Sequence, residues 1–135
     1  MKKYSKLMKC IALCLVLFTV MAFAETLGPV AMTFTQKSGQ YAGSALKESS
    51  TGADARLVVA GIDANESIAS MYYVFRKMDG VNATEELIQK GNGTFSIPYL
   101  STTVGRQGYY YQLRVAHRSQ SQYNGTVTLT VTGTP

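Results

Sequence analysis

Cysteine is scarce in this chain, and both copies, Cys10 and Cys14, lie within the first 24 residues. We predict below that this segment is removed, which leaves 111 of the 135 residues and none of them cysteine. A disulfide framework, a thiol nucleophile and a cysteine-bound zinc ion are thereby excluded. Stability must come from packing and sheet hydrogen bonds, which a domain of about 110 residues can supply.

Tryptophan is absent, and histidine occurs once, at His117. The usual zinc sites need three or four nitrogen or sulfur ligands, so we predict no metal site and no other cofactor. A glycosidase needs two carboxylates facing each other at about 5–10 Å across a cleft, but the eight Asp and Glu residues fall mostly in expected turns. We expect His117 to be half-buried near a strand end. The sequence therefore predicts a protein that is not an enzyme.

The excess of positive charge is confined to the N-terminus. Thirteen basic and eight acidic residues give a formal charge of +5, but four of the lysines precede residue 10 and no acidic residue precedes Glu25. Beyond residue 24 the chain holds nine basic and eight acidic side chains. Nucleic-acid binding needs clustered positive charge that displaces counterions from phosphates. The near-neutral balance therefore argues against a nucleic-acid partner.

Residues 1–24 have the three parts of a secretory signal peptide. Met1–Lys9 is basic, Cys10–Phe23 is an apolar run of 14 residues, and the small residues Ala22 and Ala24 frame a cleavage site. We predict a signal-peptide helix, cleavage after Ala24 and a mature chain that starts at Glu25. The alternative is an uncleaved anchor, although a membrane span needs about 20 apolar residues. The expected location is secreted, either extracellular or cell-wall-associated, with no membrane contact after cleavage, and the short lysine-rich start is typical of a bacterial signal.

Alternation with a period of two dominates the rest of the chain and predicts β-strands. In Gly125–Gly133, Val127, Leu129 and Val131 point to one face and four threonines to the other. Gly108–Arg118 alternates in the same way. Its expected inner face holds Tyr109, Tyr111, Leu113 and Val115, and its outer face holds Tyr110, Gln112 and Arg114. We expect these two strands to pair as an antiparallel hairpin with a long loop.

Further strands are expected earlier in the chain, at Val30–Gln36, Ala45–Glu48, Arg56–Ala60 and Ser70–Lys77. Thr94–Leu100 contains Pro98, which lacks an N–H group and so belongs at a sheet edge or a strand end. Thr84–Gly91 fits either a capped helix or a strand, and we favour the strand because its neighbours are β. Six to eight short strands predict one all-β domain over residues 25–135, an antiparallel sandwich of immunoglobulin-like or jelly-roll-like form.

Two short motifs stand out in the C-terminal third, Tyr111-Gln112-Leu113-Arg114 and Val131-Thr132-Gly133. On these residues the C-terminal third resembles small exported proteins of unknown function from Gram-positive bacteria, although Thr134 stands where those proteins have tryptophan. The resemblance implies a signal peptide followed by a β-sandwich and implies no activity. Gly108 and Tyr110 followed by the Gly125–Val131 strand also look like the last two strands of an immunoglobulin-like sandwich.

Tyrosine is the unusual residue, because nine occur in the chain and eight of them follow residue 24. Strand parity places Tyr110, Gln112 and Arg114 on one outer face, and Tyr72 and Arg76 extend it if their strand is adjacent. A ring, an amide and a guanidinium together suit polysaccharide hydroxyls or cell-wall carboxylates. An ordinary solvated sheet face has the same pattern.

The function that these features predict is an exported, non-enzymatic β domain that acts by binding or by its surface. The expected partner is a cell-wall glycan or another exported protein. The alternatives are a secreted antagonist, either bacteriocin-like or an enzyme inhibitor, and a glycan-binding or cell-wall-binding module. A secreted hydrolase would have His117 as its base.

Overall fold

A computed structural model describes residues 25–35, 38–63, 70–117 and 126–135 of the chain. The predicted signal peptide, with its cleavage residues Ala22 and Ala24, lies outside the described residues. Among the residues that are described, no helix is long and apolar enough to span a membrane.

The described chain is all-β, as the sequence predicts, and most strands lie close to the expected segments. The expected strand Ala45–Glu48 is the exception, because the observed strand runs from Gly39 to Leu46 and shares only Ala45 and Leu46 with it. The strands are β1 (Leu27–Phe34), β2 (Gly39–Leu46), β3 (Ala55–Ala60), β4 (Ser70–Lys77), β5 (Leu87–Lys90), β6 (Gly93–Ile97), β7 (Tyr110–His117) and β8 (Val127–Thr134). The ambiguous segment Thr84–Gly91 therefore contains a strand. β6 ends one residue before Pro98 and lies at a sheet edge, which fits the missing proline N–H.

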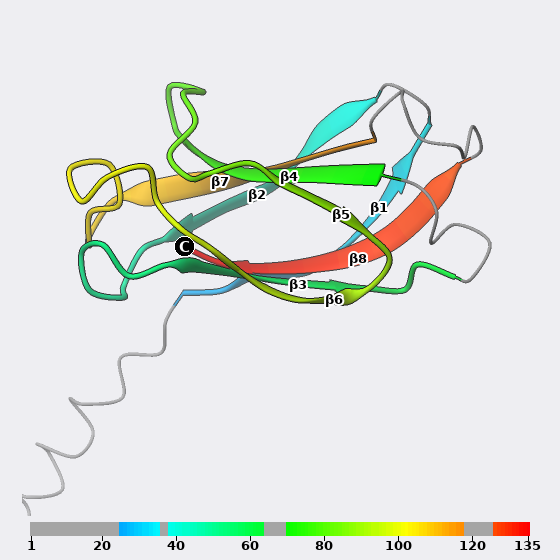
Figure 1. The fold of residues 1–135 in the computed structure, drawn as a ribbon, viewed down its shortest axis with the longest axis horizontal. Helices are drawn as coiled ribbons and strands as arrows, with labels where there is room; N and C mark the ends of the chain where they lie inside the picture. The colour runs from blue at the N-terminus through cyan, green and yellow to red at the C-terminus, as the bar shows by residue number, and fades with distance from the viewer. Residues whose placement is uncertain (1–24, 36–37, 64–69, 118–125) are drawn as a thin grey trace, which may run out of the picture.

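The strands form two antiparallel four-stranded sheets, β1-β8-β3-β6 (the first sheet) and β2-β7-β4-β5 (the second sheet). Figure 1 shows β7 and β4 running above β3 and β8. The pairs β1·β8, β2·β7, β3·β6 and β4·β5 are nested, as if one long hairpin of four strands against four had been rolled up. This order is that of a jelly roll, one of the two predicted forms.

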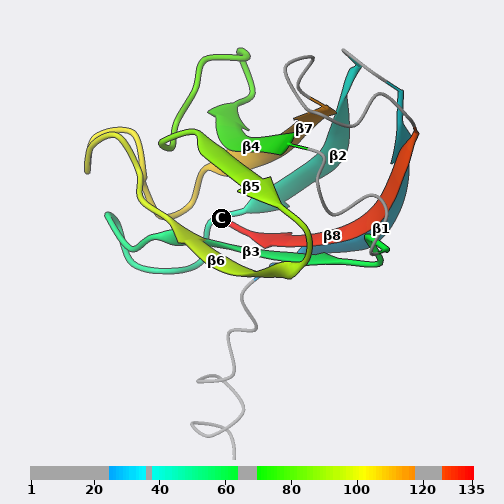
Figure 2. The same ribbon diagram turned by 45° about the vertical axis from the view of Figure 1, so that its right-hand side comes forward.

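The predicted hairpin between the last two strands is wrong. β7 pairs with β2 and β4 in the second sheet, whereas β8 pairs with β1 and β3 in the first. Likewise, the chain turns at Gly91–Asn92 from β5 into β6 and so passes from one sheet to the other, as Figure 2 shows. The immunoglobulin-like pairing of the final strands is therefore absent.

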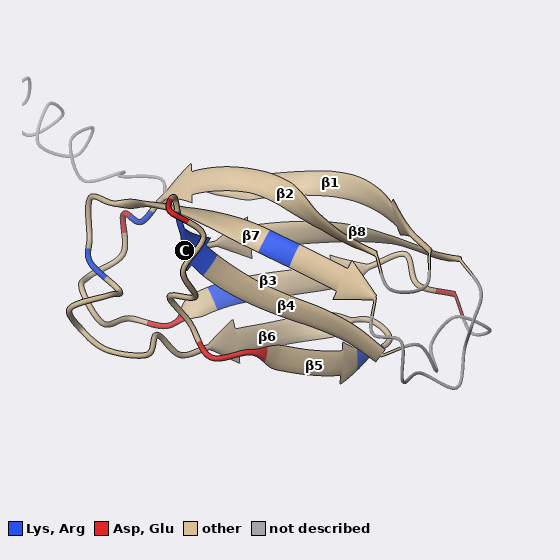
Figure 3. Ribbon diagram, turned by 90° about the horizontal axis from the view of Figure 1, so that it is seen from above, with Lys and Arg blue, Asp and Glu red and all other residues tan. Residues whose placement is uncertain are grey.

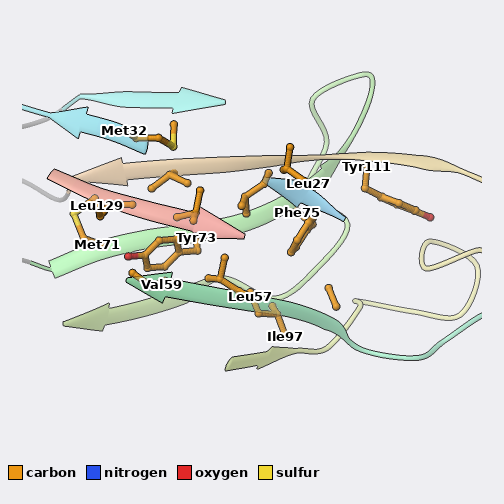
Figure 4. Packing of buried hydrophobic residues seen from close by; sticks show 14 of the residues in the cluster. Leu27, Met32, Leu57, Val59, Met71, Tyr73, Phe75, Ile97, Tyr111 and Leu129 are labelled. Atoms are coloured by element: carbon orange, nitrogen blue, oxygen red, sulfur yellow. The ribbon is translucent and has the colours of Figure 1, made fainter. Parts of the chain in front are cut away.

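The core lies between the two sheets and consists of the side chains that point inward from the strands of both. Val127, Leu129 and Val131 of β8 are at most 1% exposed and face Tyr111, Leu113 and Val115 of β7, which are equally buried. Figure 4 shows Tyr73, Leu129 and Val59 packed between the two layers. At Gly133 a Cβ atom would come within 2.9 Å of Cζ of Phe75, so the sheets approach closely there. Burial of these apolar side chains is the main stabilising contribution.

Candidate functional site

The structure brings the five predicted surface residues together on the outer face of the second sheet. β7 pairs with β4 in a register that sets Arg76 opposite Gln112 and Val74 opposite Arg114. Residues directly opposite in an antiparallel pair point to the same side. Tyr110, Gln112 and Arg114 of β7 therefore share this face with Tyr72 and Arg76 of β4.

Most of this face is used by contacts within the protein. Arg76 donates from Nε to Asn82 Oδ1 (2.8 Å) and from Nη1 to the Tyr41 hydroxyl (3.1 Å). Tyr72 donates to Glu86 Oε1 (2.8 Å), and the Arg114 guanidinium carbon lies 6.0 Å from the centre of its ring. Burial, together with the hydrogen bond to Glu86, raises the pKa of the Tyr72 phenol. With 5% of its surface exposed, Tyr72 has no free ring face for stacking, in contrast to Tyr110, which is 52% exposed.

A cleft of about 520 Å³ opens beside Tyr110, at one end of the sandwich. We call it the end cleft. Its walls are the turn after β4 and the loop that leads into β7, which Figure 1 shows at the same, left-hand end of the molecule. Its lining comprises Lys77, Met78, Asp79, Thr103, Val104, Arg106, Gly108, Tyr109, Tyr110 and Tyr111. Met78, Tyr109 and Tyr110 are each more than half exposed, so an apolar and aromatic surface is open to a ligand.

Tyr111 fixes the loop that forms one wall of the end cleft. Its side chain points inward from β7 and is 1% exposed. The hydroxyl donates to the carbonyl oxygen of Val104 and accepts the backbone N–H of Arg106 at 2.9 Å. The Tyr99 ring packs edge-on against Tyr111 with centroids 5.3 Å apart, and Gly105 lies against Tyr99 so closely that a Cβ atom would come within 2.5 Å of it. The wall is therefore held in place before any ligand arrives.

A buried lysine contacts the Tyr99 ring, which packs against the same loop. Lys47 is fully buried, and its ammonium lies 4.5 Å from the centre of the Tyr99 ring. It donates to Ser49 Oγ (2.6 Å) and to the carbonyl oxygen of Ala53 (2.8 Å). Burial lowers the pKa of Lys47, and the negative charge of Asp54 partly opposes this shift. The ammonium is satisfied inside the protein, so Lys47 is a structural residue.

The charges on the end cleft favour an anion. Lys77 Nζ lies 3.5 Å from Asp79 Oδ2, so these two charges largely cancel. The backbone N–H of Val81 donates to Asp79 Oδ1 at 3.0 Å, and this bond, with the charge of Lys77, lowers the pKa of the carboxyl. The exposed guanidinium of Arg106 makes no ion pair with any residue that the structure describes. Figure 3 shows that charged residues are few on the two sheets and recur in the loops at this end.

His117 lies in the core and not in the end cleft. It is 2% exposed, and neither ring nitrogen has a hydrogen-bond partner within the described part of the chain. Its position is on the inward face that strand parity indicates, although it is more deeply buried than the expected half. No three His, Cys, Asp or Glu side chains of residues 25–35, 38–63, 70–117 and 126–135 gather into a metal-holding group.

Sequence reasoning missed the end cleft because two loops far apart in the chain form it. The available signal was the run Tyr109-Tyr110-Tyr111, in which alternation can bury only one or two rings. In the structure β7 begins at Tyr110, so Tyr109 precedes the strand and is 56% exposed instead of facing the core. Met78 next to Asp79-Gly80 was a second signal, since a large apolar side chain in a turn has no core to join.

A scan of the sequence against protein-family models gives no match, and neither does a search of the curated proteins. Among solved structures, the chain is similar to the Yersinia pseudotuberculosis-derived mitogen, at 14% identity and a TM-score of 0.47, over 81% of this chain and 82% of that chain. It is similar to PliG of Aeromonas hydrophila, a periplasmic lysozyme inhibitor of g-type lysozyme, at 11% identity and a TM-score of 0.48, over 83% and 87% of the two chains. It is also similar to the VP2 subviral particle of infectious bursal disease virus, at 11% identity and a TM-score of 0.48, over 80% of this chain and 30% of that chain. Likenesses this distant carry no argument about ligand, partner or activity.

Proposed function

We propose that this protein is an exported, non-enzymatic binding domain whose ligand occupies the end cleft. The observation that carries the proposal is a preformed concavity of about 520 Å³ edged by the half-exposed side chains of Met78, Tyr109 and Tyr110, with Arg106 beside them. Ligand sites are typically concavities of roughly 300–1,000 Å³ with an apolar and aromatic lining and a few polar groups. Apolar side chains gathered on an open surface mark interaction sites.

The chemistry of the end cleft supports binding over catalysis. Asp79 is the single carboxylate among its lining residues, and it is occupied by Val81 and Lys77. The carboxylate pair that a glycosidase needs is not found on this lining. His117 lies at the opposite end of β7, about 23 Å from Tyr110 at the usual rise of a strand. A histidine base at that distance cannot reach a ligand in the end cleft.

Export is the second part of the proposal, and its support is the basic, apolar and small-residue pattern of residues 1–24. An exported binding domain meets cell-wall glycans and other exported proteins. A secreted antagonist would use the same cleft against a protein target. A glycan-binding module is the second candidate function, because Tyr110 continues from the end cleft onto the face that carries Gln112 and Arg114.

The test is a binding screen with soluble and insoluble probes. Isotope-labelled protein is titrated with chitin oligomers, cello-oligosaccharides and short peptides while amide resonances are followed, and retention on purified cell wall is measured in parallel. We expect at least one class of probe to shift the resonances of the end cleft or to retain the protein, and Tyr110→Ala to abolish the effect. Leu100→Ala is the control, because Leu100 is 51% exposed but lies outside the lining. Binding to no probe, or binding that Tyr110→Ala leaves unchanged, would refute the proposal.

A further inference from the structure

Several polar groups of the end-cleft lining are already used by contacts within the protein. The carboxylate of Asp79 already receives the Val81 N–H and faces Lys77, and the hydroxyl of Thr103 lies 2.8 Å from that of Ser101. The Tyr111 hydroxyl is bonded to the backbone on both sides. A neutral sugar presents many hydroxyl groups that need acceptors as well as donors. These internal bonds reduce the number of acceptors left for such a sugar.

The apolar part of the lining has the composition of a protein-binding surface. Tyrosine, methionine and arginine are the residue types enriched at protein interfaces, and tyrosine and arginine dominate their energetic centres. Met78, Tyr109 and Tyr110 expose 59%, 56% and 52% of their surfaces around one concavity. Val81, in the same turn as Met78, is 55% exposed and extends the apolar rim. Such a rim around a concavity fits a large apolar side chain supplied by a partner.

Arg106, which makes no ion pair within the described part of the chain, adds a second requirement on the ligand. Lys77 and Asp79 offset each other at 3.5 Å, which leaves the exposed Arg106 as the uncompensated charge of the lining. A guanidinium binds a carboxylate through two parallel hydrogen bonds, a geometry that an ammonium does not match. The backbone of Arg106 is tied to the Tyr111 hydroxyl at 2.9 Å, so the base of its side chain is held at the edge of the cleft.

We propose that the end cleft receives a loop of a partner protein in which a large apolar or aromatic side chain lies next to a carboxylate. This inference rests on the proposed binding function of the cleft and names the class of its partner. The apolar side chain packs against Tyr109, Tyr110 and Met78, while the carboxylate accepts hydrogen bonds from Arg106. The walls need little rearrangement, because Tyr111 and Tyr99 hold the loop in place, and binding to a preorganised surface loses less conformational entropy.

The experiment compares matched peptide probes by resonance shifts on the full-length protein. The probes are blocked pentapeptides with Phe next to Asp, Phe next to Asn, and Ala next to Asp, together with an oligogalacturonate and a chitin oligomer. We expect the Phe–Asp peptide to shift the resonances of Tyr110 and Arg106. Replacing Asp by Asn in this peptide should weaken its affinity for the protein about threefold to fivefold, which corresponds to the free energy of one exposed ion pair.

Two protein variants complete the test. Arg106→Gln should remove the difference between the Asp and Asn peptides, whereas Arg56→Gln, an exposed arginine on the first sheet, should leave it unchanged. Tyr110→Ala should weaken the Phe–Asp peptide by more than about fivefold, as expected for an aromatic residue at the centre of an interface. Binding of oligogalacturonate or the chitin oligomer without the peptides would overturn the inference and leave the proposed function standing. Failure of all five probes to shift the cleft resonances would overturn the inference and count against the proposed function as well.

Discussion

Two single variants that each remove one tyrosine hydroxyl from the core should have opposite effects. Tyr73→Phe should stabilise the folded protein, whereas Tyr111→Phe should destabilise it. Tyr73 and Tyr111 are both at most 1% exposed and both point into the space between the sheets. The Tyr73 hydroxyl is buried with no hydrogen-bond partner in the part of the chain that the structure describes. The Tyr111 hydroxyl bonds to the backbone of Val104 and of Arg106.

The magnitudes follow from the fate of the buried polar groups. A buried hydroxyl without a partner costs about 1–3 kcal/mol, so Tyr73→Phe should raise the free energy of unfolding by about 1–2 kcal/mol. Tyr111→Phe instead leaves a carbonyl and an N–H group without their partner, so it should lower the free energy of unfolding by about 1–3 kcal/mol. For a domain of this size each kcal/mol corresponds to about 4 °C in Tm.

Urea unfolding followed by circular dichroism measures both changes, with the midpoint read at constant slope. Tyr109→Phe is the control, since the 56% exposure of Tyr109 places the substitution within about 0.5 kcal/mol of no effect. A Tyr73→Phe midpoint at or below that of the wild type would refute the assignment of an unpartnered hydroxyl. Equal effects of Tyr73→Phe and Tyr111→Phe would refute the contrast between the two sites.

Three further outcomes are expected. Burial raises the pKa of the Tyr73 phenol, so the folded protein retains a proton that the unfolded chain releases near pH 10. The free energy of unfolding should therefore fall as the pH rises above about 10. A pH series of thermal melts should show a shallower fall for Tyr73→Phe than for the wild type. The Asn92 side chain accepts a hydrogen bond from the N–H of Ile62 and donates one to the carbonyl oxygen of Ile62, both at 2.9 Å. Asn92→Ala should therefore lower the free energy of unfolding by about 1–2 kcal/mol and speed hydrogen exchange of the Ile62 amide. Unchanged exchange at Ile62 would contradict this expectation. Gly133→Ala forces a Cβ atom to 2.9 Å from Phe75 and should cost about 1–3 kcal/mol in chemical denaturation, whereas a neutral effect would mean that the sheets can separate locally.

Alternation identifies which residues of this chain form strands and which side faces inward, because both depend on local sequence. Ser70–Lys77 is a strand with the expected bounds, and Val127, Leu129 and Val131 are buried as their spacing predicts. Strand partners depend on the path of the chain between strands, which the period of two does not encode. The expected hairpin of β7 and β8 fails for this reason, since the intervening segment joins strands of different sheets.

The candidate site likewise combines features that local sequence predicts with features that depend on distant parts of the chain. Parity places Tyr72 correctly on the outer face, but it cannot show that Arg114 and Glu86 bury the ring. Those contacts come from another strand and from the segment before β5. The end cleft depends on two loops separated by more than twenty residues, and only the pairing of β4 with β7 brings them together.

The nested pairing of the strands bears on how the chain acquires its fold. β8 lies between β1 and β3, and its partners in β1 are 93 to 106 residues distant in sequence. The first sheet therefore lacks the strand that joins β1 to β3 until Val127–Thr134 has been made. Contacts between residues so far apart in sequence form slowly. The core of the first sheet can therefore close only after β8 has been made. For the export proposed above, this late closure would leave the chain in the unfolded form that a secretion pore admits.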